Sequence, residues 1–373
     1  MEKEKQYKIV LTGGGSGGHV MPLVAVANSL RHKLGEHTDF LYIGSKGKIE
    51  QDAMDEAFVP VKFILTGKMR RYFALQNFVD FFKIPVGFVQ ALWYLLQYMP
   101  DVVFSKGGHV AVPVVLAAWM YRIPILTQDS DAVPGMSTRI LGKFAKRVAV
   151  AYPSAMKYFP ADSVALIGNP VRSEIIKGDV IEARKRFGLD ETKPVILVIG
   201  GSLGARIIDK AIVTLLPKLL SQSQVIHQTG RAHYDETVQM AEEIGIKANT
   251  AGYVPRDFLQ MEDLMHALAV ADLVISRAGA NAIAEIAAVG KPSILIPLSS
   301  AANDEQRMNA YEIARVGGAV VLEDGNLGEN IFLGKITDLL QDKNLREHMA
   351  QAIKVFYHPD AADVIADELI RLM

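Results

Sequence analysis

A glycine-rich turn near the amino terminus carries the first residues with a recognisable chemistry. The segment 13–18 contains only glycine and serine, and His19 follows it directly. It lies between an apolar run and a stretch with helical spacing, where backbone N–H groups and a helix N-terminus commonly bind phosphate oxygens. A histidine at the mouth of such a turn adds a group that titrates near neutral pH. The turn predicts a phosphate site beside a candidate general base.

Two further turns of this kind occur in the second half of the chain. The segments 200–205 and 276–281 each follow an apolar run and precede a helical stretch. Three such turns at strand ends, spread over two halves of the chain, predict a ligand bound through its phosphates in a cleft between two domains.

Other nucleotide chemistries fit these turns less well. The first turn contains the G-x-G-x-x-G spacing, but the second expected strand ends in Tyr42-Ile43-Gly44-Ser45-Lys46, without the acidic residue that binds a ribose in dinucleotide-binding proteins. NAD binding is therefore disfavoured. No Walker loop is present, so ATP hydrolysis is not supported. A tight turn without a ligand remains the plain alternative, although the run of glycine and serine exceeds what a turn requires.

Short apolar runs alternate with amphipathic stretches and must position these turns. Strands are expected at 7–12, 39–43, 102–105, 123–127 and 147–151, with a helix at 22–34. The pattern restarts with strands at 195–199, 224–229, 273–276, 293–297 and 319–322, and a helix at 205–216. This alternation predicts βαβ units with parallel sheets. Because Asn169-Pro170 suits a linker, we expect an α/β protein with domains over 1–167 and 168–373.

Composition is consistent with a globular protein of this size. The chain has 373 residues, 50% of them hydrophobic, and a formal net charge of −1, so bulk charge gives no reason to expect nucleic acid binding. The absence of cysteine excludes disulfides, thiolate metal sites and a cysteine nucleophile. The apolar stretch 9–11 is too short for a secretory signal, and the window 110–126 is interrupted by two prolines and an arginine. No membrane span is expected.

Taken together, these motifs resemble the MurG family. The matching segments, in family order, are 13–19, 104–108, 129–135, 168–172, 200–205, 227–230, 276–285 and 304–310. The resemblance covers nearly the whole chain and implies the GT-B fold, with two Rossmann-like, doubly wound domains and an interdomain cleft. Family members usually end in a helix that returns to the first domain, and the amphipathic stretch 361–372 is the candidate for it.

The resemblance also implies a reaction. Enzymes of this family transfer N-acetylglucosamine from UDP-N-acetylglucosamine (UDP-GlcNAc) to undecaprenyl-pyrophosphoryl-MurNAc-pentapeptide, the lipid I to lipid II step of peptidoglycan synthesis. We accordingly expect an inverting hexosyltransferase whose partners are UDP-GlcNAc, a lipid-linked muramoyl-pentapeptide acceptor and a membrane surface. No cofactor is expected. The expected location is peripheral, at the cytoplasmic face of the plasma membrane.

Substrate-binding residues are carried over from the same resemblance. Glu285 would accept hydrogen bonds from the uridine ribose, and Gln306 would contact the donor sugar. Ser202 and Arg172 would contact the diphosphate, although a linker surface charge is the plain alternative for Arg172. The substrate-binding set implied is Ser16, Gly17, Gly18, Asp131, Arg172, Ser202, Ala280, Asn281, Glu285 and Gln306. Uracil contacts are expected from the loop at 253–264, without a named residue.

Inverting displacement needs a general base on the acceptor hydroxyl and charge stabilisation for the departing UDP. His19 is the candidate base, since a helix N-terminus lowers the pKa of a histidine and keeps it neutral. A role confined to hydrogen bonding the loop backbone stays open for it. Asp129 is the rival base, and the sequence leaves the role of its loop undecided, as it does for His109.

No obligatory metal is expected. Asp129-Ser130-Asp131 has the Asp-x-Asp spacing, but it lies in the first domain on a loop that the family uses otherwise. Helix dipoles and Arg172 would balance the charge of the leaving group instead.

The region 67–99 suggests contact with a membrane surface. Lys68, Arg70 and Arg71 precede an aromatic-rich stretch, a composition that suits peripheral docking on anionic lipid. Packing in a helix core also explains most of these aromatics one by one.

Two other activities share the double Rossmann layout. A GT-B transferase acting on a diacylglycerol-type lipid would share the donor-side motifs, whereas the segments 105–109 and 68–72 favour the muramoyl acceptor. A UDP-sugar 2-epimerase would convert UDP-GlcNAc without any acceptor. A non-catalytic nucleotide-binding protein is disfavoured because His19 and Glu285 are both retained.

Overall fold

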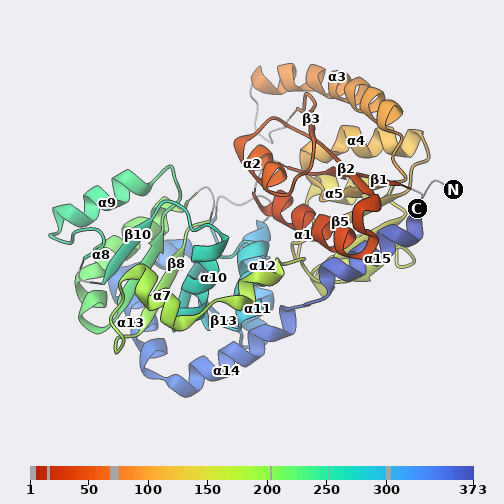
Figure 1. The fold of residues 1–373 in the computed structure, drawn as a ribbon. Helices are drawn as coiled ribbons and strands as arrows, with labels where there is room; N and C mark the ends of the chain where they lie inside the picture. Colours follow the sequence, from red (N-terminus) through yellow and green to blue (C-terminus); the bar gives the residue numbers. More distant parts are fainter. Residues whose placement is uncertain (1–5, 15–16, 68–74, 202–203, 251, 300–303) are drawn as a thin grey trace. The chain divides into compact units, whose positions relative to one another are not determined.

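The computed structural model describes residues 6–14, 17–67, 75–201, 204–250, 252–299 and 304–373, with side chains described except at 17, 49 and 75–82 (Figure 1). The chain divides into two units. Unit 1 comprises Met1–Arg172 and His358–Met373, and unit 2 comprises Ser173–Tyr357. The sequence places the boundary between residues 167 and 168, whereas this division falls after Arg172 and assigns the carboxyl-terminal segment to unit 1.

Unit 1 contains a parallel sheet with the strand order β3-β2-β1-β4-β5-β6-β7. Its strands are β1 (Tyr7–Thr12), β2 (Thr38–Gly44), β3 (Val61–Phe63), β4 (Val102–Ser105), β5 (Ile125–Asp129), β6 (Arg147–Val150) and β7 (Val164–Leu166). The order reverses between β1 and β4, where Thr12 pairs with Ser105. This is the classic Rossmann arrangement of strands around a topological switch point.

Two larger hydrophobic clusters join helices of unit 1 to the sheet, and a smaller one surrounds Val148 and Phe159. The helices are α1 (Gly17–Leu34), α2 (Lys48–Glu56), α3 (Leu75–Tyr98), α4 (Gly108–Met120), α5 (Met136–Leu141), α6 (Pro153–Met156) and α15 (Ala361–Leu372), with the short η1 (Gly35–His37). One of the larger clusters joins α1, α2 and α15 to the sheet through residues such as Leu23, Met54 and Ile365. The other larger cluster joins α3 and α4 to it through Leu95 and Val114.

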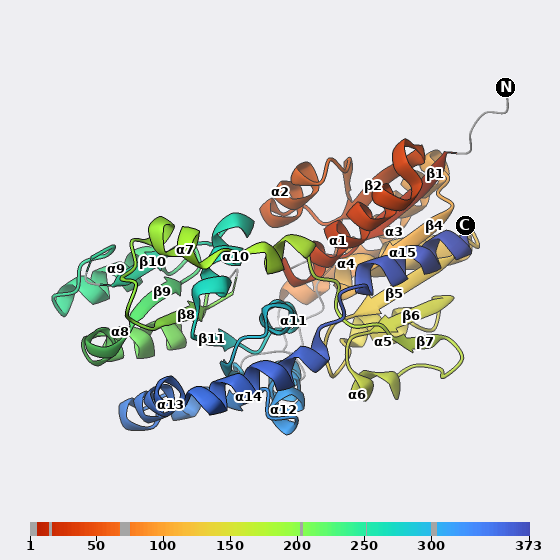
Figure 2. The same ribbon diagram turned by 60° about the horizontal axis from the view of Figure 1, so that its bottom comes forward.

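The carboxyl-terminal helix α15 lies beside α1, as Figures 1 and 2 both show. Ile365, Ala366 and Leu369 of α15 are fully or nearly fully buried in the same core as Val26 and Leu30 of α1. Close to where the chain leaves and re-enters unit 1, Gly168 lies against His358. A Cβ on Gly168, whose φ is +94°, would lie only 2.4 Å from Cδ2 of that imidazole.

Unit 2 repeats the arrangement. Its parallel sheet has the order β10-β9-β8-β11-β12-β13. The strands are β8 (Val195–Ile199), β9 (Gln224–Gln228), β10 (Tyr253–Arg256), β11 (Leu273–Arg277), β12 (Ser293–Ile296) and β13 (Ala319–Val321). Here the order reverses between β8 and β11, where Ile199 pairs with Ser276.

The helices of unit 2 pack in two groups. They are α7 (Val180–Phe187), α8 (Arg206–Gln222), α9 (Tyr234–Glu243), α10 (Met261–Val270), α11 (Ala280–Val289), α12 (Glu305–Arg315), α13 (Glu329–Gln341) and α14 (Lys343–Ile353), with the short η2 (Ser173–Lys177), η4 (Asp324–Asn326) and η5 (Lys354–Phe356). The main core joins α8 and α13 to the sheet through Ile212, Leu216 and Phe332. In the other group, α10 packs with α7 and α11.

The expected strands are confirmed to within two residues at each end, but three strands were missed. β3, β7 and β10 were not predicted, and all three are sheet edges of three or four residues. The helix expected at 22–34 begins at Gly17, so Gly18 and His19 lie in its first turn rather than in the loop before it. The helix expected at 205–216 extends to Gln222.

Candidate functional site

The strand order of each unit identifies where a ligand should bind. In open α/β sheets, ligands bind beyond the carboxyl ends of the two strands between which the order reverses. In unit 1 the loops at that point follow β1 and β4, and in unit 2 they follow β8 and β11. These are the glycine-rich turns of the sequence together with the segment 105–108.

The turn after β1 is held closely against the end of β4. The Lys106 amide donates to the Thr12 carbonyl at 2.8 Å. A Cβ on Gly13 would lie 2.9 Å from Cβ of Lys106, so only glycine allows this approach. On the other side, the buried Tyr42 hydroxyl donates to the Gly13 carbonyl. Gly13, at the start of the turn, is therefore held between β2 and β4.

His19 lies in the first turn of α1 and remains partly exposed. Burial, followed by the positive charge of Lys106 and the effect of His109, lowers the pKa of His19 to about 3. A Cβ on Gly108 would lie 3.7 Å from its Nε2 atom, which places the imidazole against the start of α4. The imidazole is therefore neutral at physiological pH.

Lys106 is a residue of this edge to which the sequence analysis gave no role. Its side chain is 3% exposed, and its ammonium donates to Oγ of Ser130 at 2.6 Å. The Ser130 hydroxyl in turn donates to Oδ1 of Asn169. Burial lowers the pKa of Lys106 to about 8, against the opposing effect of Asp129 and Asp131. In the sequence, Lys106 is distinguished only as a basic residue between a predicted strand and two glycines.

Asp129, the rival base, is engaged by its own loop. Its Oδ1 accepts the Asp131 amide at 3.0 Å and its Oδ2 accepts the Gly135 amide at 3.2 Å, and the residue is 5% exposed. Asp131 is partly exposed. The two carboxylates share the carboxyl end of β5 with Ser130, so the structure gathers them with Lys106.

The turn after β8 in unit 2 is organised by Arg277 at the end of β11. Its Nη1 donates to the carbonyls of Gly200 and Gly204, at 3.3 Å each. Burial lowers the pKa of Arg277, with Glu305 opposing, although an arginine stays charged. Gly204 has φ +76°, and a Cβ there would lie 2.4 Å from the Thr229 carbonyl. The sequence analysis quoted Arg277 within a motif but gave it no role.

The start of α11 offers backbone N–H groups at the same edge. Gly279 is its N-cap, without a side-chain cap, and Ala280 and Asn281 form its first turn. Glu285 lies in the second turn and is partly exposed, whereas the neighbouring Ala284 and Ile286 are buried. Such an N-terminus binds anions.

The side-chain amides of two residues in α12 form hydrogen bonds with the neighbouring loops. Oε1 of Gln306 accepts the Leu298 amide at 3.2 Å, and Nδ2 of Asn309 donates to the Ala278 carbonyl at 3.3 Å. Both side chains are buried. Gln306 therefore joins Ala280, Asn281 and Glu285 in one region of unit 2, and Asn309 is a further residue that the sequence analysis did not single out.

His227, from the matching segment 227–230, has a different role. Its Nε2 lies 3.1 Å from Oδ1 of Asp209 and its Nδ1 lies 3.2 Å from the Tyr253 hydroxyl, and all three residues are fully buried. This network joins α8, β9 and β10 inside the core. It explains a polar motif by packing rather than by ligand binding.

The remaining predicted residues are placed as follows. Ser16 and Ser202 lie outside the described residues, as do the basic residues of 68–72. Gly17 and Gly18 open α1. Arg172 is partly exposed at the end of the first segment of unit 1. Within the described part of the chain, no three His, Asp or Glu side chains are grouped so as to hold a metal ion.

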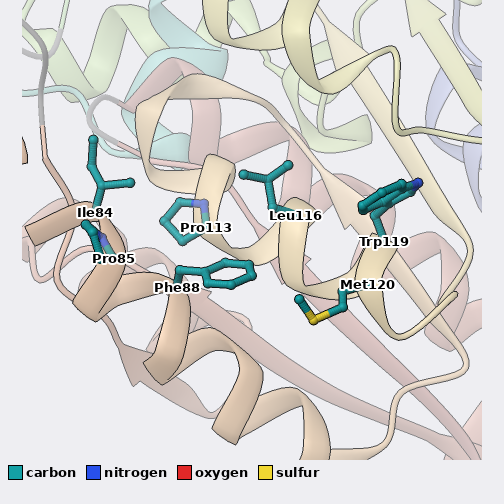
Figure 3. A pocket seen from close by; sticks show the side chains of 7 residues that line it. All are labelled: Ile84, Pro85, Phe88, Pro113, Leu116, Trp119 and Met120. Atoms are coloured by element: carbon teal, nitrogen blue, oxygen red, sulfur yellow. The ribbon is translucent and has the colours of Figure 1, made fainter.

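Unit 1 also carries an apolar pocket of about 400 Å³ between α3 and α4, shown in Figure 3. The residues that line it are Ile84, Pro85, Phe88, Pro113, Leu116, Trp119 and Met120. Large apolar side chains on the same two helices are exposed, including Val89, Trp93 and Leu96. None of the helices in the described ranges is both long and apolar enough to cross a membrane.

Comparison with known proteins agrees with this architecture. Residues 9–150 match the glycosyltransferase family 28 N-terminal domain, and residues 195–365 match the C-terminal domain of that family. A Clostridium perfringens UDP-N-acetylglucosamine–N-acetylmuramyl-(pentapeptide) pyrophosphoryl-undecaprenol N-acetylglucosamine transferase is 39% identical over 346 residues, which are 92% of this chain and 93% of the relative.

Solved structures give the same result. The crystal structure of Acinetobacter baumannii MurG aligns with a TM-score of 0.73 at 26% identity, covering 98% of this chain and 99% of that one. A UDP-GlcNAc 2-epimerase from Neisseria meningitidis, bound to UDP-GlcNAc, aligns with a TM-score of 0.69 over 98% of this chain and all of the other, but at 13% identity that likeness concerns the fold alone. With its GT-B fold and a relative of this identity over nearly its full length, the chain belongs to the MurG family of glycosyltransferases.

Proposed function

We propose that this protein transfers N-acetylglucosamine from UDP-GlcNAc to undecaprenyl-pyrophosphoryl-MurNAc-pentapeptide, converting lipid I to lipid II in peptidoglycan synthesis. The observation that carries this function is the 39% identity to a transferase of this specificity over 92% of the chain. The function is also supported by the sheet edge at the switch point of each unit, because these edges carry the groups that such a transfer needs.

The donor binds at the edge of unit 2. The N-terminus of α11 and Arg277 supply positive charge for the diphosphate, while Glu285 accepts hydrogen bonds from the ribose hydroxyls. Gln306, held by the Leu298 amide, contacts the sugar. Ser202 and Arg172 add to the diphosphate contacts.

The acceptor hydroxyl is activated at the edge of unit 1. Its oxygen attacks the anomeric carbon, the bond from that carbon to UDP breaks, and the hydroxyl proton passes to His19. This assignment is supported by the position of His19 in the first turn of α1, against the start of α4, and by the two backbone amides that already occupy the carboxylate oxygens of Asp129. The acceptor is also contacted by Asp131, Gly17 and Gly18. UDP leaves with its charge balanced by α11 and Arg277, so no metal is required.

The acceptor is a lipid, and the apolar face of unit 1 suits a membrane surface. Trp93 and Trp119 are 58% and 55% exposed beside the pocket between α3 and α4. The basic residues of 68–71 precede α3 in sequence. Together they support peripheral binding to anionic lipid on the cytoplasmic side, where the nucleotide-sugar donor is made.

Release of UDP from UDP-GlcNAc, with and without a short-chain analogue of lipid I, tests the reaction. We expect release that depends on the analogue and yields a disaccharide product. Conversion of UDP-GlcNAc without acceptor would indicate an epimerase instead. Release only with diacylglycerol would replace the acceptor, and loss of activity with EDTA that magnesium restores would refute the metal-free mechanism.

Flotation with phosphatidylglycerol vesicles tests the membrane surface. Trp93→Ser should weaken vesicle binding several-fold. Phe58→Ser, which alters an exposed aromatic of unit 1 outside α3 and α4, should leave it unchanged. Equal binding by wild type and Trp93→Ser would contradict the docking face while leaving the transferase assignment in place.

A further inference from the structure

Lys106 is a buried cation that the mechanism above does not use. It follows β4 directly, at the switch point of unit 1, and its side chain is 3% exposed. An ammonium group is costly to bury unless its charge is compensated. The contacts at Lys106 show what compensates it.

The ammonium lies at the start of a chain of hydrogen bonds across three strand ends. It donates to Ser130 after β5, and Ser130 donates to Asn169, which follows β7. The side-chain amide of Gln128 adds to these hydrogen bonds, since its Nε2 donates to Oγ of Ser130 at 3.4 Å. Lys106 therefore holds the loop between the two aspartates.

The same cation acts on His19 across the glycine turn. After burial, its charge is the next largest cause of the lowered pKa of His19. The other ionisable groups around this position are His109 at the start of α4, Asp129 and Asp131 after β5, and Glu50 and Tyr42 behind the turn. Glu50 and Tyr42 are near Gly14: a Cβ built on that glycine would lie 3.1 Å from Oε1 of Glu50 and 3.0 Å from the Tyr42 hydroxyl.

We propose that Lys106 is a positioning residue of the transfer reaction, and that the unit 1 edge is competent only while Lys106 is an ammonium ion. Protonated, it donates to Ser130 as a charged group, is attracted by the carboxylates of Asp129 and Asp131, and holds the loop 129–131. Deprotonated, it loses that attraction and weakens its hold on the loop. The predicted effect on turnover rests on the proposed function, whereas the predicted effect of the Lys106 charge on the His19 ring nitrogens does not.

The pKa of Lys106, about 8, sets where the effect should be visible. The dependence of kcat/KM on pH should show a decline above about pH 8. Arginine retains its charge throughout this range. In Lys106→Arg the decline should therefore move up by more than one pH unit. Lys106→Met should lose about tenfold to a hundredfold in kcat/KM, as misplaced catalytic groups do, and show no decline near pH 8.

A readout that needs no turnover separates this inference from the proposed function. In NMR spectra, the chemical shifts of the His19 ring nitrogens, assigned by comparison with His19→Gln, should change near pH 8 in the wild type as Lys106 loses its proton. That transition should be absent in Lys106→Arg and Lys106→Met. Lys143→Met, an exposed lysine of unit 1, is the matched control and should retain it.

The outcomes are distinct. A wild-type decline and nitrogen transition near pH 8 that persist unchanged in Lys106→Arg would overturn the proposal, as would a wild-type pH profile in Lys106→Met. If the wild type transfers no sugar but the nitrogen transition depends on Lys106, the proposed function fails and the coupling stands. Should Lys106→Met not fold in a thermal melt, Lys106→Arg carries the test, because a merely structural lysine would not move a pH midpoint.

Discussion

Lys106 and Arg277 occupy equivalent positions in the two units. Ser105 pairs with the last residue of β1, Ser276 pairs with the last residue of β8, and each serine is followed by a basic residue. The segments are Ser-Lys-Gly-Gly in unit 1 and Ser-Arg-Ala-Gly in unit 2. Each cation therefore stands beside the glycine turn at the switch point of its own sheet.

The two cations point to different partners. Lys106 donates to Ser130 on the loop after the next strand, near the carboxylates of Asp129 and Asp131, whereas Arg277 donates to the carbonyls of the glycine turn itself. A buried ammonium titrates near neutral pH, while a guanidinium remains charged. Under the proposed function, the same fold position would support proton transfer in unit 1 and would supply permanent charge for a diphosphate in unit 2.

The change with the largest expected effect removes the proposed base from unit 1. His19→Ala should lower kcat by about 10²- to 10⁴-fold, the usual contribution of general acid–base catalysis, with little change in the KM for UDP-GlcNAc. Steady-state kinetics with the lipid I analogue measure both constants. His32→Ala alters an exposed histidine of the same helix and should behave as wild type. Undiminished turnover in folded His19→Ala would exclude this base.

Removing the carboxylate of unit 2 should affect donor binding instead. Glu285→Ala should raise the KM for UDP-GlcNAc about 30-fold, about 2 kcal/mol, the value of hydrogen bonds to a charged group. Glu242→Ala, an exposed glutamate of α9, is the control. A loss confined to kcat would contradict the division between the units, and calorimetric titration with UDP would show it without the acceptor.

Arg277→Met should have a smaller effect, on the affinity of unit 2 for UDP. Loss of its charge and of the bonds to Gly200 and Gly204 should weaken UDP binding about tenfold, because charge-assisted hydrogen bonds to a diphosphate disappear. Arg315→Met, at a 70% exposed side chain, should leave the affinity unchanged. Unaltered UDP affinity in Arg277→Met would limit this arginine to a structural role.

The smallest expected effect is on stability at mildly acidic pH. The pKa of His19 is about 3 in the folded protein and 6.5 ordinarily, so below pH 6.5 the unfolded chain takes up a proton that the folded chain does not. Stability is therefore lost as pH falls from 6.5 towards 3. Between pH 7 and pH 6 His19→Gln should lose about 0.7 kcal/mol less than wild type in urea unfolding. A matching slope in both proteins would mean that His19 is not desolvated as described.

The sequence predicted the two α/β units because buried parallel strands are continuous apolar runs, and those runs are visible without knowledge of their neighbours. It also predicted the glycine turns, since a turn of this kind depends on local backbone freedom at residues such as Gly13 and Gly204. The edge strands β3, β7 and β10 were not predicted, because strands of three or four residues at a sheet edge show little periodicity.

Only the tertiary structure decided what the polar residues at those turns do. Lys106, Ser130 and Asn169 are up to 63 positions apart in sequence, yet the adjacent ends of parallel strands bring them into one chain of hydrogen bonds. His227 begins one of the segments that match the family, and its contacts with Asp209 and Tyr253 in the core became visible only in the structure. Burial and partners determine whether such a group titrates, donates or packs, and both depend on segments distant in the sequence.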